Sequence, residues 1–156
     1  MIQEFLMLPV TRELLAGPQA RNISGTLGGY GNLFTFIGFE SGSDPISPIV
    51  SLLEKTQITF NNLNSRGITK IRIEMPSAKD IFSVTPLPWA NGISWAKSIE
   101  VGMSGLGQYM NKESIISRSG AGIQSAKKIR AGKFSNVPYI SKFVNSWQKQ
   151  FTKLSK

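Results

Sequence analysis

The sequence predicts an α+β fold: a small body with a few strands and two helices, plus an extended basic C-terminal arm ending in an amphipathic helix. Two patterns predict the body, because apolar residues recur at helical spacing in some segments and alternate with polar residues in another. A third predicts the arm, because all nine acidic residues lie at or before Glu113. We therefore expect a mixed α/β body over residues 1–113 and a basic, partner-binding arm over residues 114–156.

The first part of the body is expected to be mostly irregular. Residues 1–22 begin apolar but are interrupted at Pro9 and Pro18, which leaves room for one short helical turn near Thr11–Ala16. The glycine-rich run over 25–32 predicts a loop. Residues 33–39 are apolar at almost every position, a pattern typical of a buried strand.

A first helix is expected to begin at Asp44 and Pro45. An aspartate there can cap the free amides, and proline is tolerated in the first turn. The apolar spacing favours a long helix that continues to Leu63 and stops at Gly67. The β-branched residues within 56–60 leave a strand there as the alternative.

The remaining elements follow from alternation, proline content and helical spacing. Residues 68–75 alternate and predict a half-exposed strand. The prolines that follow predict a loop around Ile81 and Phe82, and a second helix is expected over 94–110, although its glycines would weaken it. Residues 111–137 should be largely irregular. Apolar residues at helical spacing then predict a last helix over 138–154.

The composition excludes many kinds of active site. The chain has no Cys and no His, so thiol chemistry, zinc–thiolate sites and histidine acid–base catalysis are ruled out. The glycine-rich run precedes its apolar segment and lacks the lysine of a phosphate-binding loop. Glu40 and Asp44 could form a carboxylate pair, but Asp44 already suits a helix cap. We therefore predict no enzyme, and no catalytic, cofactor or metal-binding residues.

The C-terminal arm is the most informative segment. Residues 114–156 carry nine basic residues and no acid, which accounts for the whole net charge of +9. The same segment contains an apolar stripe, which a merely solubilising tail would not need. We expect the arm to reach a partner chain rather than close onto the core. The predicted partner-binding residues are Arg118, Lys127, Lys128, Arg130, Lys133, Phe143, Trp147 and Phe151.

The charge of the arm leaves two other partners open. A run of four bases within seven residues would suit the phosphates of nucleic acid, although no known reading motif accompanies it. A cationic amphipathic helix could also lie on a membrane surface. No stretch is long and apolar enough to predict a membrane span. Trp95 and Trp147 fall on helical stripes, which favours packing over base stacking, whereas the role of Trp89 stays open.

Several short motifs stand out along the chain: Gly38-Phe39-x-Ser41-Gly42-x-Asp44-Pro45, Thr85-Pro86-Leu87-Pro88-Trp89, Gly92-x-Ser94-Trp95, Ser104-Gly105-Leu106, Ser117-Arg118-Ser119-Gly120 and Ile129-Arg130-x-Gly132. Together they resemble a type of small virion protein of tailed bacteriophages that is encoded among tail and baseplate genes. The resemblance implies a non-enzymatic structural protein of the virion, assembled in the host cytoplasm. Its implied partners are other tail or baseplate proteins and copies of itself, with nucleic acid as the alternative.

Overall fold

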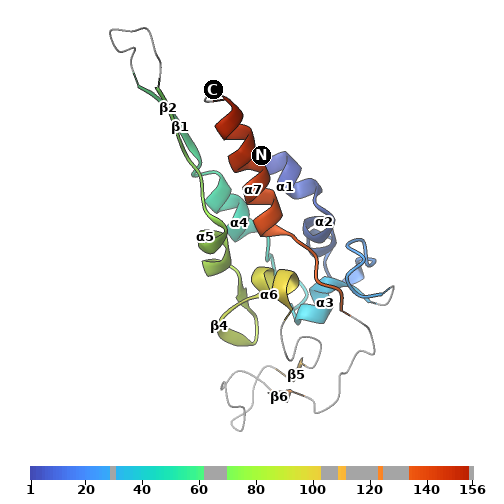
Figure 1. The fold of residues 1–156 in the computed structure, drawn as a ribbon. Coiled ribbons are helices and arrows are strands. Elements are labelled where there is room, and N and C mark those ends of the chain that lie inside the picture. Colours follow the sequence, from blue (N-terminus) through green and yellow to red (C-terminus); the bar gives the residue numbers. More distant parts are fainter. Residues whose placement is uncertain (29–30, 62–69, 103–108, 112–122, 125–133, 155–156) are drawn as a thin grey trace.

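A computed structural model describes residues 1–28, 31–61, 70–102, 109–111, 123–124 and 134–154 (Figure 1). Helices and antiparallel strands are both present, which confirms the α+β class. The helices are α1 (Ile2–Met7), α2 (Pro9–Leu15), the 3₁₀ turn η1 (Gly17–Gln19), α3 (Leu33–Ile37), α4 (Ser47–Leu53), α5 (Ala78–Ser83), α6 (Trp95–Val101) and α7 (Ile140–Leu154). The strands are β1 (Gln57–Asn61), β2 (Lys70–Glu74), β3 (Pro86–Leu87), β4 (Ala90–Ser94), β5 (Tyr109–Asn111) and β6 (Ile123–Gln124). Within these ranges they pair as two-stranded ribbons, β1 with β2, β3 with β4 and β5 with β6.

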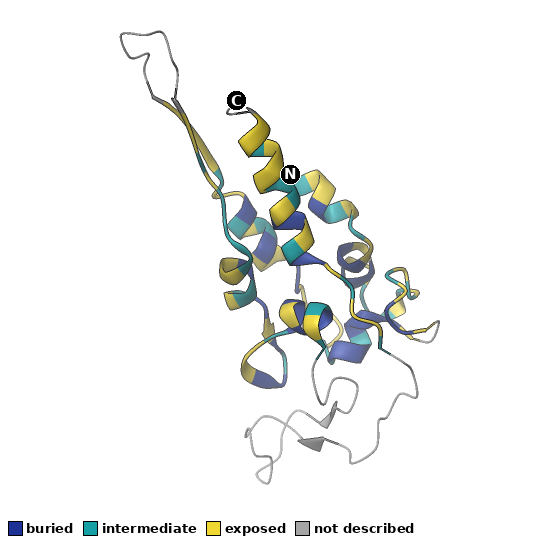
Figure 2. Ribbon diagram, viewed as in Figure 1, coloured by how far each residue is buried: buried dark blue, intermediate teal, exposed yellow. Residues whose placement is uncertain are grey.

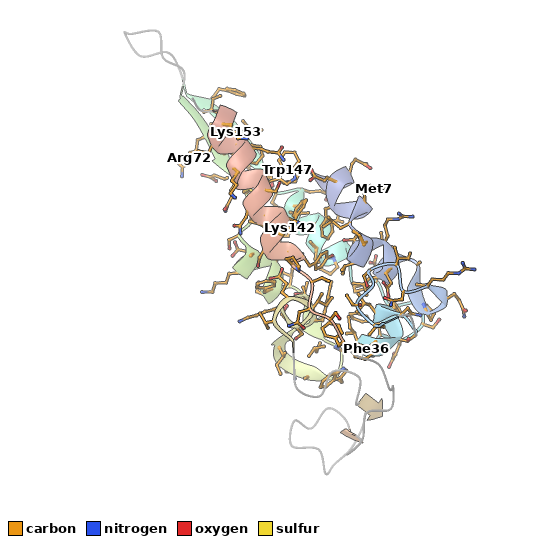
Figure 3. The ribbon with its side chains drawn as sticks, turned by 45° about the vertical axis from the view of Figure 1, so that its right-hand side comes forward. Met7, Phe36, Arg72, Lys142, Trp147 and Lys153 are labelled. Atoms are coloured by element: carbon orange, nitrogen blue, oxygen red, sulfur yellow. The ribbon has the colours of Figure 1, made fainter. Side chains whose placement is uncertain are left out.

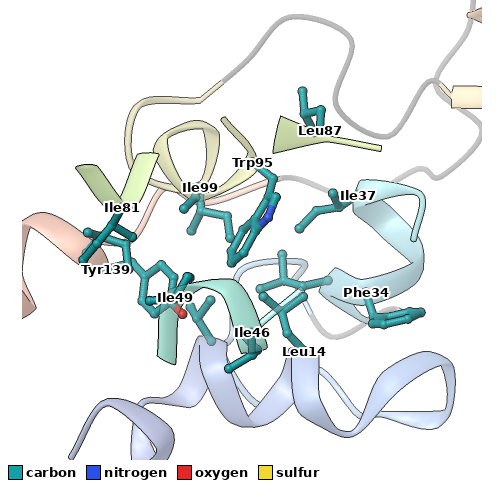
Figure 4. Close-up of a cluster of buried hydrophobic side chains, with 14 of the residues drawn as sticks. Leu14, Phe34, Ile37, Ile46, Ile49, Ile81, Leu87, Trp95, Ile99 and Tyr139 are labelled. Atoms are coloured by element: carbon teal, nitrogen blue, oxygen red, sulfur yellow. The ribbon is translucent and has the colours of Figure 1, made fainter. Parts of the chain in front are cut away.

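Helices supply most of the core, and the strands that the structure describes pair only two by two. Figure 4 shows Trp95 of α6 among Leu14 of α2, Ile37 of α3 and Ile99 of its own helix, all of them almost fully buried. Each such side chain contributes about 1.5–3 kcal/mol on burial. Trp89 joins this core and donates from Nε1 to the carbonyl of Ile37 at 2.6 Å. Trp89 and Trp95 are therefore structural and cannot serve as platforms for bases.

The N-terminus is more helical than expected. Two helices, α1 and α2, occupy most of residues 2–15, where the sequence predicted one short turn. Pro9 does not interrupt the structure, because it occupies the start of α2, where its missing N–H has no helical partner to lose. The two helices bury Phe5, Val10 and Leu14.

The predicted strand over 33–39 is wrong, because this segment forms α3. The Asn32 side chain caps the helix by accepting from the Thr35 amide at 2.9 Å. Gly38 ends it with a φ of 97°, a left-handed conformation that favours glycine. The helix is short and buried on most sides, so its sequence lacks the polar face that distinguishes a helix from a buried strand.

The long first helix is also wrong, and the alternative strand is confirmed. Asp44 accepts from the amides of Ile46 and Ser47, as a capping residue should, but α4 ends at Leu53. Strand β1 follows and pairs antiparallel with β2, which matches the predicted half-exposed strand. The proposed stop at Gly67 lies outside the described residues.

Two further expectations fail between residues 76 and 111. The predicted loop around Ile81 contains α5, which begins with a reciprocal cap: Ser77 accepts from the Asp80 amide, and Asp80 accepts from the Ser77 amide. The hydrogen bonds from Ser77 hold the pKa of Asp80 below its usual value. The second helix ends early, since α6 stops at Val101 and residues 109–111 form a strand. Gly102 takes a φ of 76°, and a side chain there would crowd Asn136.

The last helix is confirmed as α7, but its first turns belong to the core. Tyr139, Ile140, Phe143 and Val144 are buried, and the ring of Phe143 contacts that of Phe5 at a centroid distance of 5.5 Å. The expectation that the arm stays off the body is therefore wrong for this part of it. Charge alone cannot place a helix whose apolar stripe fits the core of the same chain.

Candidate interaction surface

The buried carboxylates of the described residues accept hydrogen bonds that hold the body together. The carboxylate of Glu13 is fully buried and accepts from the amides of Ser24 and Leu33, at 2.7 and 2.6 Å. It thereby joins α2 to both ends of the glycine-rich loop, which supports the interpretation of that loop as a structural turn. Across the described residues, no three potential metal ligands gather.

A second carboxylate ties α7 to the body. Glu100 of α6 accepts from the amide and the hydroxyl of Ser141, at 2.6 and 2.5 Å. A negative charge at the first turn of a helix is favourable, because the amide groups there are unpaired and the helix dipole is positive. Two residues earlier, just before α7, the Tyr139 hydroxyl meets that of Thr11 at 2.8 Å in a buried pair. Burial raises the pKa of Tyr139 well above its usual value.

A cavity of about 360 Å³ lies where α1 and α2 meet the start of α7. Its lining is mainly apolar and includes Leu8, Val10 and Phe143, with Glu4 and Lys142 among the polar groups. The Tyr139 hydroxyl, the one phenol in the lining, is already bonded to Thr11. This cavity therefore presents no group arranged for catalysis.

The predicted partner-binding residues fall into three groups. Arg118, Lys127, Lys128, Arg130 and Lys133 lie outside the described residues. Phe143 is buried in the core, so it cannot contact a partner at the surface. Trp147 and Phe151 are half-buried on the outer part of α7, with ring centroids 5.4 Å apart.

Exposed lysines mark the outer side of α7. Lys142, Lys149 and Lys153 are exposed, and none of them forms an ion pair with any residue in the described ranges. Lys149 and Lys153 line a shallow concavity of about 400 Å³ together with Asn145, Gln148 and Thr152. The outer part of α7 therefore combines unneutralised positive charge with two incompletely buried aromatic rings.

The β1–β2 hairpin has one polar and one apolar face. In its register Ile58 lies opposite Ile73 and Phe60 lies opposite Ile71, so these four side chains share one face. Phe60 is 67% exposed, Ile58 51% and Ile71 40%. The opposite face carries the ion pair between Arg72 and Glu74 at 2.8 Å. The hairpin thus offers solvent a row of large apolar side chains.

The sequence predicts only one of the two strands that form this apolar face. The alternation of Ile71 and Ile73 predicted the second strand and its two faces. The matching residues Ile58 and Phe60 were assigned to a helix, so the cross-strand pairs could not be foreseen. Only the pairing register brings the four side chains together.

The hairpin and the outer part of α7 extend from the same end of the molecule. Figures 1 and 3 show them side by side in both views, and Figure 2 shows exposed residues along both. Met75 follows β2 directly and packs against the core. Because side chains alternate along a strand, Ile71 and Ile73 lie on the same face as Met75. We call the four hairpin residues together with Trp147 and Phe151 the hairpin–helix surface. Lys149 and Lys153 each lie two residues away from one of these rings, on the opposite face of α7, where they line the shallow concavity.

Trp147 packs against the core and leaves one polar atom there without a partner. Its Nε1 is buried without a hydrogen-bond partner among the described residues. Leaving a donor buried and unpaired costs about 1–3 kcal/mol. The packing of Trp147 in the isolated chain is therefore poorer than that of Trp89, whose Nε1 is bonded.

In the part of the chain that the structure describes, no helix has the length and apolarity to cross a membrane. Comparisons with protein-family models, with curated proteins and with solved structures find no match to this chain. Any functional conclusion therefore depends on the chain's own residues and on the surface that they form.

Proposed function

We propose that the chain is a non-enzymatic structural protein of a phage tail or baseplate that docks on neighbouring virion subunits. The observation that carries the proposal is the hairpin–helix surface, which exposes an apolar face at one end of a small body. The neighbouring helix α7 also exposes lysines that form no ion pair with any described residue. Such a combination has little use in a chain that acts alone, because exposed apolar patches mark sites that another molecule covers. The resemblance to phage tail proteins directs this general reading to the virion.

The chemistry of the body supports a non-enzymatic role. Its buried carboxylates, Glu13 and Glu100, are occupied by backbone amides and by a serine hydroxyl. The chain has neither histidine nor cysteine to supply a base or a nucleophile near neutral pH. Docking needs none of these groups.

Purified virions of the source phage give the first test. Mass spectrometry should detect the chain in fixed proportion to known tail proteins, after the particles have been washed in high salt. Absence from washed particles, with the chain present in the infected cell, would contradict a structural role.

A second candidate function is nucleic-acid binding, which the row of exposed, unpaired lysines on α7 favours. Each phosphate neutralised on duplex DNA adds nearly one unit to the slope of log affinity against log salt. A titration of labelled duplex DNA with the whole chain at several salt concentrations separates the two functions. A slope of about five or more would favour nucleic acid, whereas weak binding with a shallow slope would favour docking on protein.

A further inference from the structure

We infer that one polar face of α7 binds the phosphate backbone of nucleic acid without reading its base sequence. The shallow concavity of about 400 Å³ on this helix is lined by Asn145, Gln148, Lys149, Thr152 and Lys153. We call these five residues the α7 polar face. The inference rests on the second candidate function, nucleic-acid binding, and gives that function a site. It does not depend on docking through the hairpin–helix surface.

The spacing of the five residues places them on one side of the helix. They follow Asn145 at three, four, seven and eight residues, and such positions share a helical face. Lys149 and Lys153 lie about 6 Å apart along the helix axis. Phe143 and Trp147 are on the other side of α7, where they pack with the core. All five residues of the α7 polar face are exposed, so a ligand can approach them from solvent.

The positive charge of this face is not offset within the described structure. Neither Lys149 nor Lys153 forms an ion pair with a described residue, and no acidic residue follows Glu113 in the sequence. A lysine in the last turn of a helix is favourable in itself, because the helix dipole is negative there. That effect accounts for Lys153. It does not account for Lys149, which precedes the last turn, so this charge is available to an anionic ligand.

The side chains of this face are suited to phosphate oxygens. The two lysines carry ammonium groups, and the amides of Asn145 and Gln148 each have two N–H donors. Side chains of these types commonly contact phosphate oxygens, and such contacts carry no sequence information. Thr152 has a different role, because its hydroxyl donates to the Gln148 carbonyl at 2.8 Å. The face therefore offers cations and amide donors without a carboxylate among them.

The composition of this face favours nucleic acid over an acidic protein. Protein interfaces obtain most of their affinity from central anchors, which are enriched in aromatic residues and arginine. Each described residue that lines the concavity is polar or basic, and none is apolar or aromatic. Interfaces with DNA are more polar and more positively charged than interfaces between proteins. The α7 polar face has the composition of the first kind.

A membrane surface matches this helix less well, although lipid headgroups also carry phosphate. A cationic amphipathic helix binds a membrane by burying its apolar side at the boundary of the acyl chains. In α7 that side packs with the body, since Phe143 and Val144 are buried and Trp147 contacts the core. The helix cannot turn this side to a membrane while the fold is kept. Lipid would therefore meet the polar side alone.

The test measures binding of the full chain to a labelled DNA duplex of about two helical turns, by fluorescence anisotropy at several salt concentrations. Log affinity should fall linearly with log salt, by nearly one unit of slope for each phosphate neutralised. Lys149→Gln combined with Lys153→Gln should reduce the slope by about two and weaken binding on the order of tenfold at low salt. Duplexes of unrelated sequence should lose affinity equally, because phosphate contacts do not read bases.

A matched control removes the same charge from another part of the body. Lys79→Gln combined with Lys97→Gln also lowers the net charge by two, at exposed positions on α5 and α6. This control should leave the slope unchanged. The remaining basic residues, including Arg118 and Lys127, are the same in both variants, so the difference between their slopes reports on α7. A melting curve for each variant checks that the fold is kept.

Several results would overturn the inference. A steep wild-type slope that the substitutions at Lys149 and Lys153 leave unchanged places nucleic-acid binding elsewhere in the chain, and the second candidate function then stands without this site. Absence of salt-dependent DNA binding in the wild type contradicts the site and that function together. Tighter binding to polyglutamate than to DNA, lost in the same variant, makes an acidic protein the partner.

Lipid is tested with vesicles that contain phosphatidylserine. Sedimentation of the chain with these vesicles that the same variant abolishes, while its DNA binding persists, makes lipid headgroups the ligand and overturns the inference. Detection of the chain in virions tests the docking proposal separately, because the rings of the hairpin–helix surface lie on the other side of α7.

Discussion

At the scale of single residues, buried polar groups hold the body together. Glu13 is the clearest case, because its fully buried carboxylate has amide partners and no cation in the described structure. The sequence does not predict this burial, because glutamate side chains are usually exposed to solvent. Only the folded path of the glycine-rich loop brings the Ser24 and Leu33 amides to it.

We predict that Glu13→Ala destabilises the protein by about 3 kcal/mol, because two buried amides lose a charged acceptor. Glu4→Ala is the control, since Glu4 is exposed on the neighbouring helix and should change stability by less than about 0.5 kcal/mol. Urea denaturation followed by circular dichroism measures both. Equal stability of the two variants would show that Glu13 does not hold the loop.

Tyr139 gives a prediction for alkaline pH. Its pKa is raised in the folded chain by burial, so the neutral phenol stabilises the fold at pH values below the ordinary tyrosine pKa of about 10. That contribution is lost as pH rises above about 10, because the unfolded chain then loses a proton that the folded chain retains. One of the three tyrosines should therefore ionise only together with unfolding, as seen by phenolate absorbance and circular dichroism. Tyr139→Phe should remove that late step; its persistence in this variant would contradict the assignment.

At the scale of elements, predictability followed the clarity of the local pattern. Helix α7 was predicted almost to its ends, because its apolar stripe recurs at helical spacing over four turns. Helix α3 was mistaken for a strand, because a short buried helix has too few polar positions to show a period. Helix α5 was missed although Ser77 and Asp80 form a recognisable capping pair.

The charge pattern does not predict that α7 packs against the body. The break at Glu113 suggested an arm independent of the body, yet Tyr139, Ile140, Phe143 and Val144 complete the core. Charged residues indicate which positions face solvent, and they say nothing about where the four buried side chains pack. We therefore expect the body to depend on this part of the arm for its stability.

We predict that truncation after Lys112 leaves an unfolded chain. Four buried side chains, each worth about 1.5–3 kcal/mol, are lost from a domain whose total stability is typically about 5–15 kcal/mol. Truncation after Lys149 keeps those residues and should stay folded. Near-ultraviolet circular dichroism distinguishes the two outcomes. A folded fragment 1–112 would show that the body is independent of α7, as the charge break alone suggested.

The anchor of α7 can be tested without deleting the helix. Glu100→Ala removes the acceptor of the Ser141 amide and hydroxyl at the first turn. We expect a loss of about 1–2 kcal/mol, as for other helix caps. Glu54→Ala, at an exposed position after α4, is the control and should leave stability unchanged. If Glu100→Ala and Glu54→Ala unfold at the same midpoint, apolar contacts alone attach α7 to the body.

At the scale of the whole molecule, the chain is a small helical core with an unsatisfied end. The core uses Trp89, Trp95 and Tyr139, whereas the hairpin–helix surface leaves the side chain of Phe60 largely exposed. The sequence predicts Trp147 and Phe151 as interaction residues, and this stays a prediction. It does not predict the apolar hairpin face, because a surface built from two strands depends on pairing register. The central claim is that this end docks on another virion protein.

Incorporation of variants into particles tests that claim most directly. The amount of chain per purified virion is measured by quantitative mass spectrometry for wild type, for Phe60→Ser with Ile71→Ser, and for Ile93→Ser, each supplied in place of the native chain. Ile93 is the control, because it is 43% exposed on β4, at the other end of the molecule from the hairpin. The account predicts a loss on the order of tenfold for the hairpin variant, as expected when central apolar anchors are removed, and wild-type levels for Ile93→Ser. Equal incorporation of all three chains, each folded to the same extent, would contradict it.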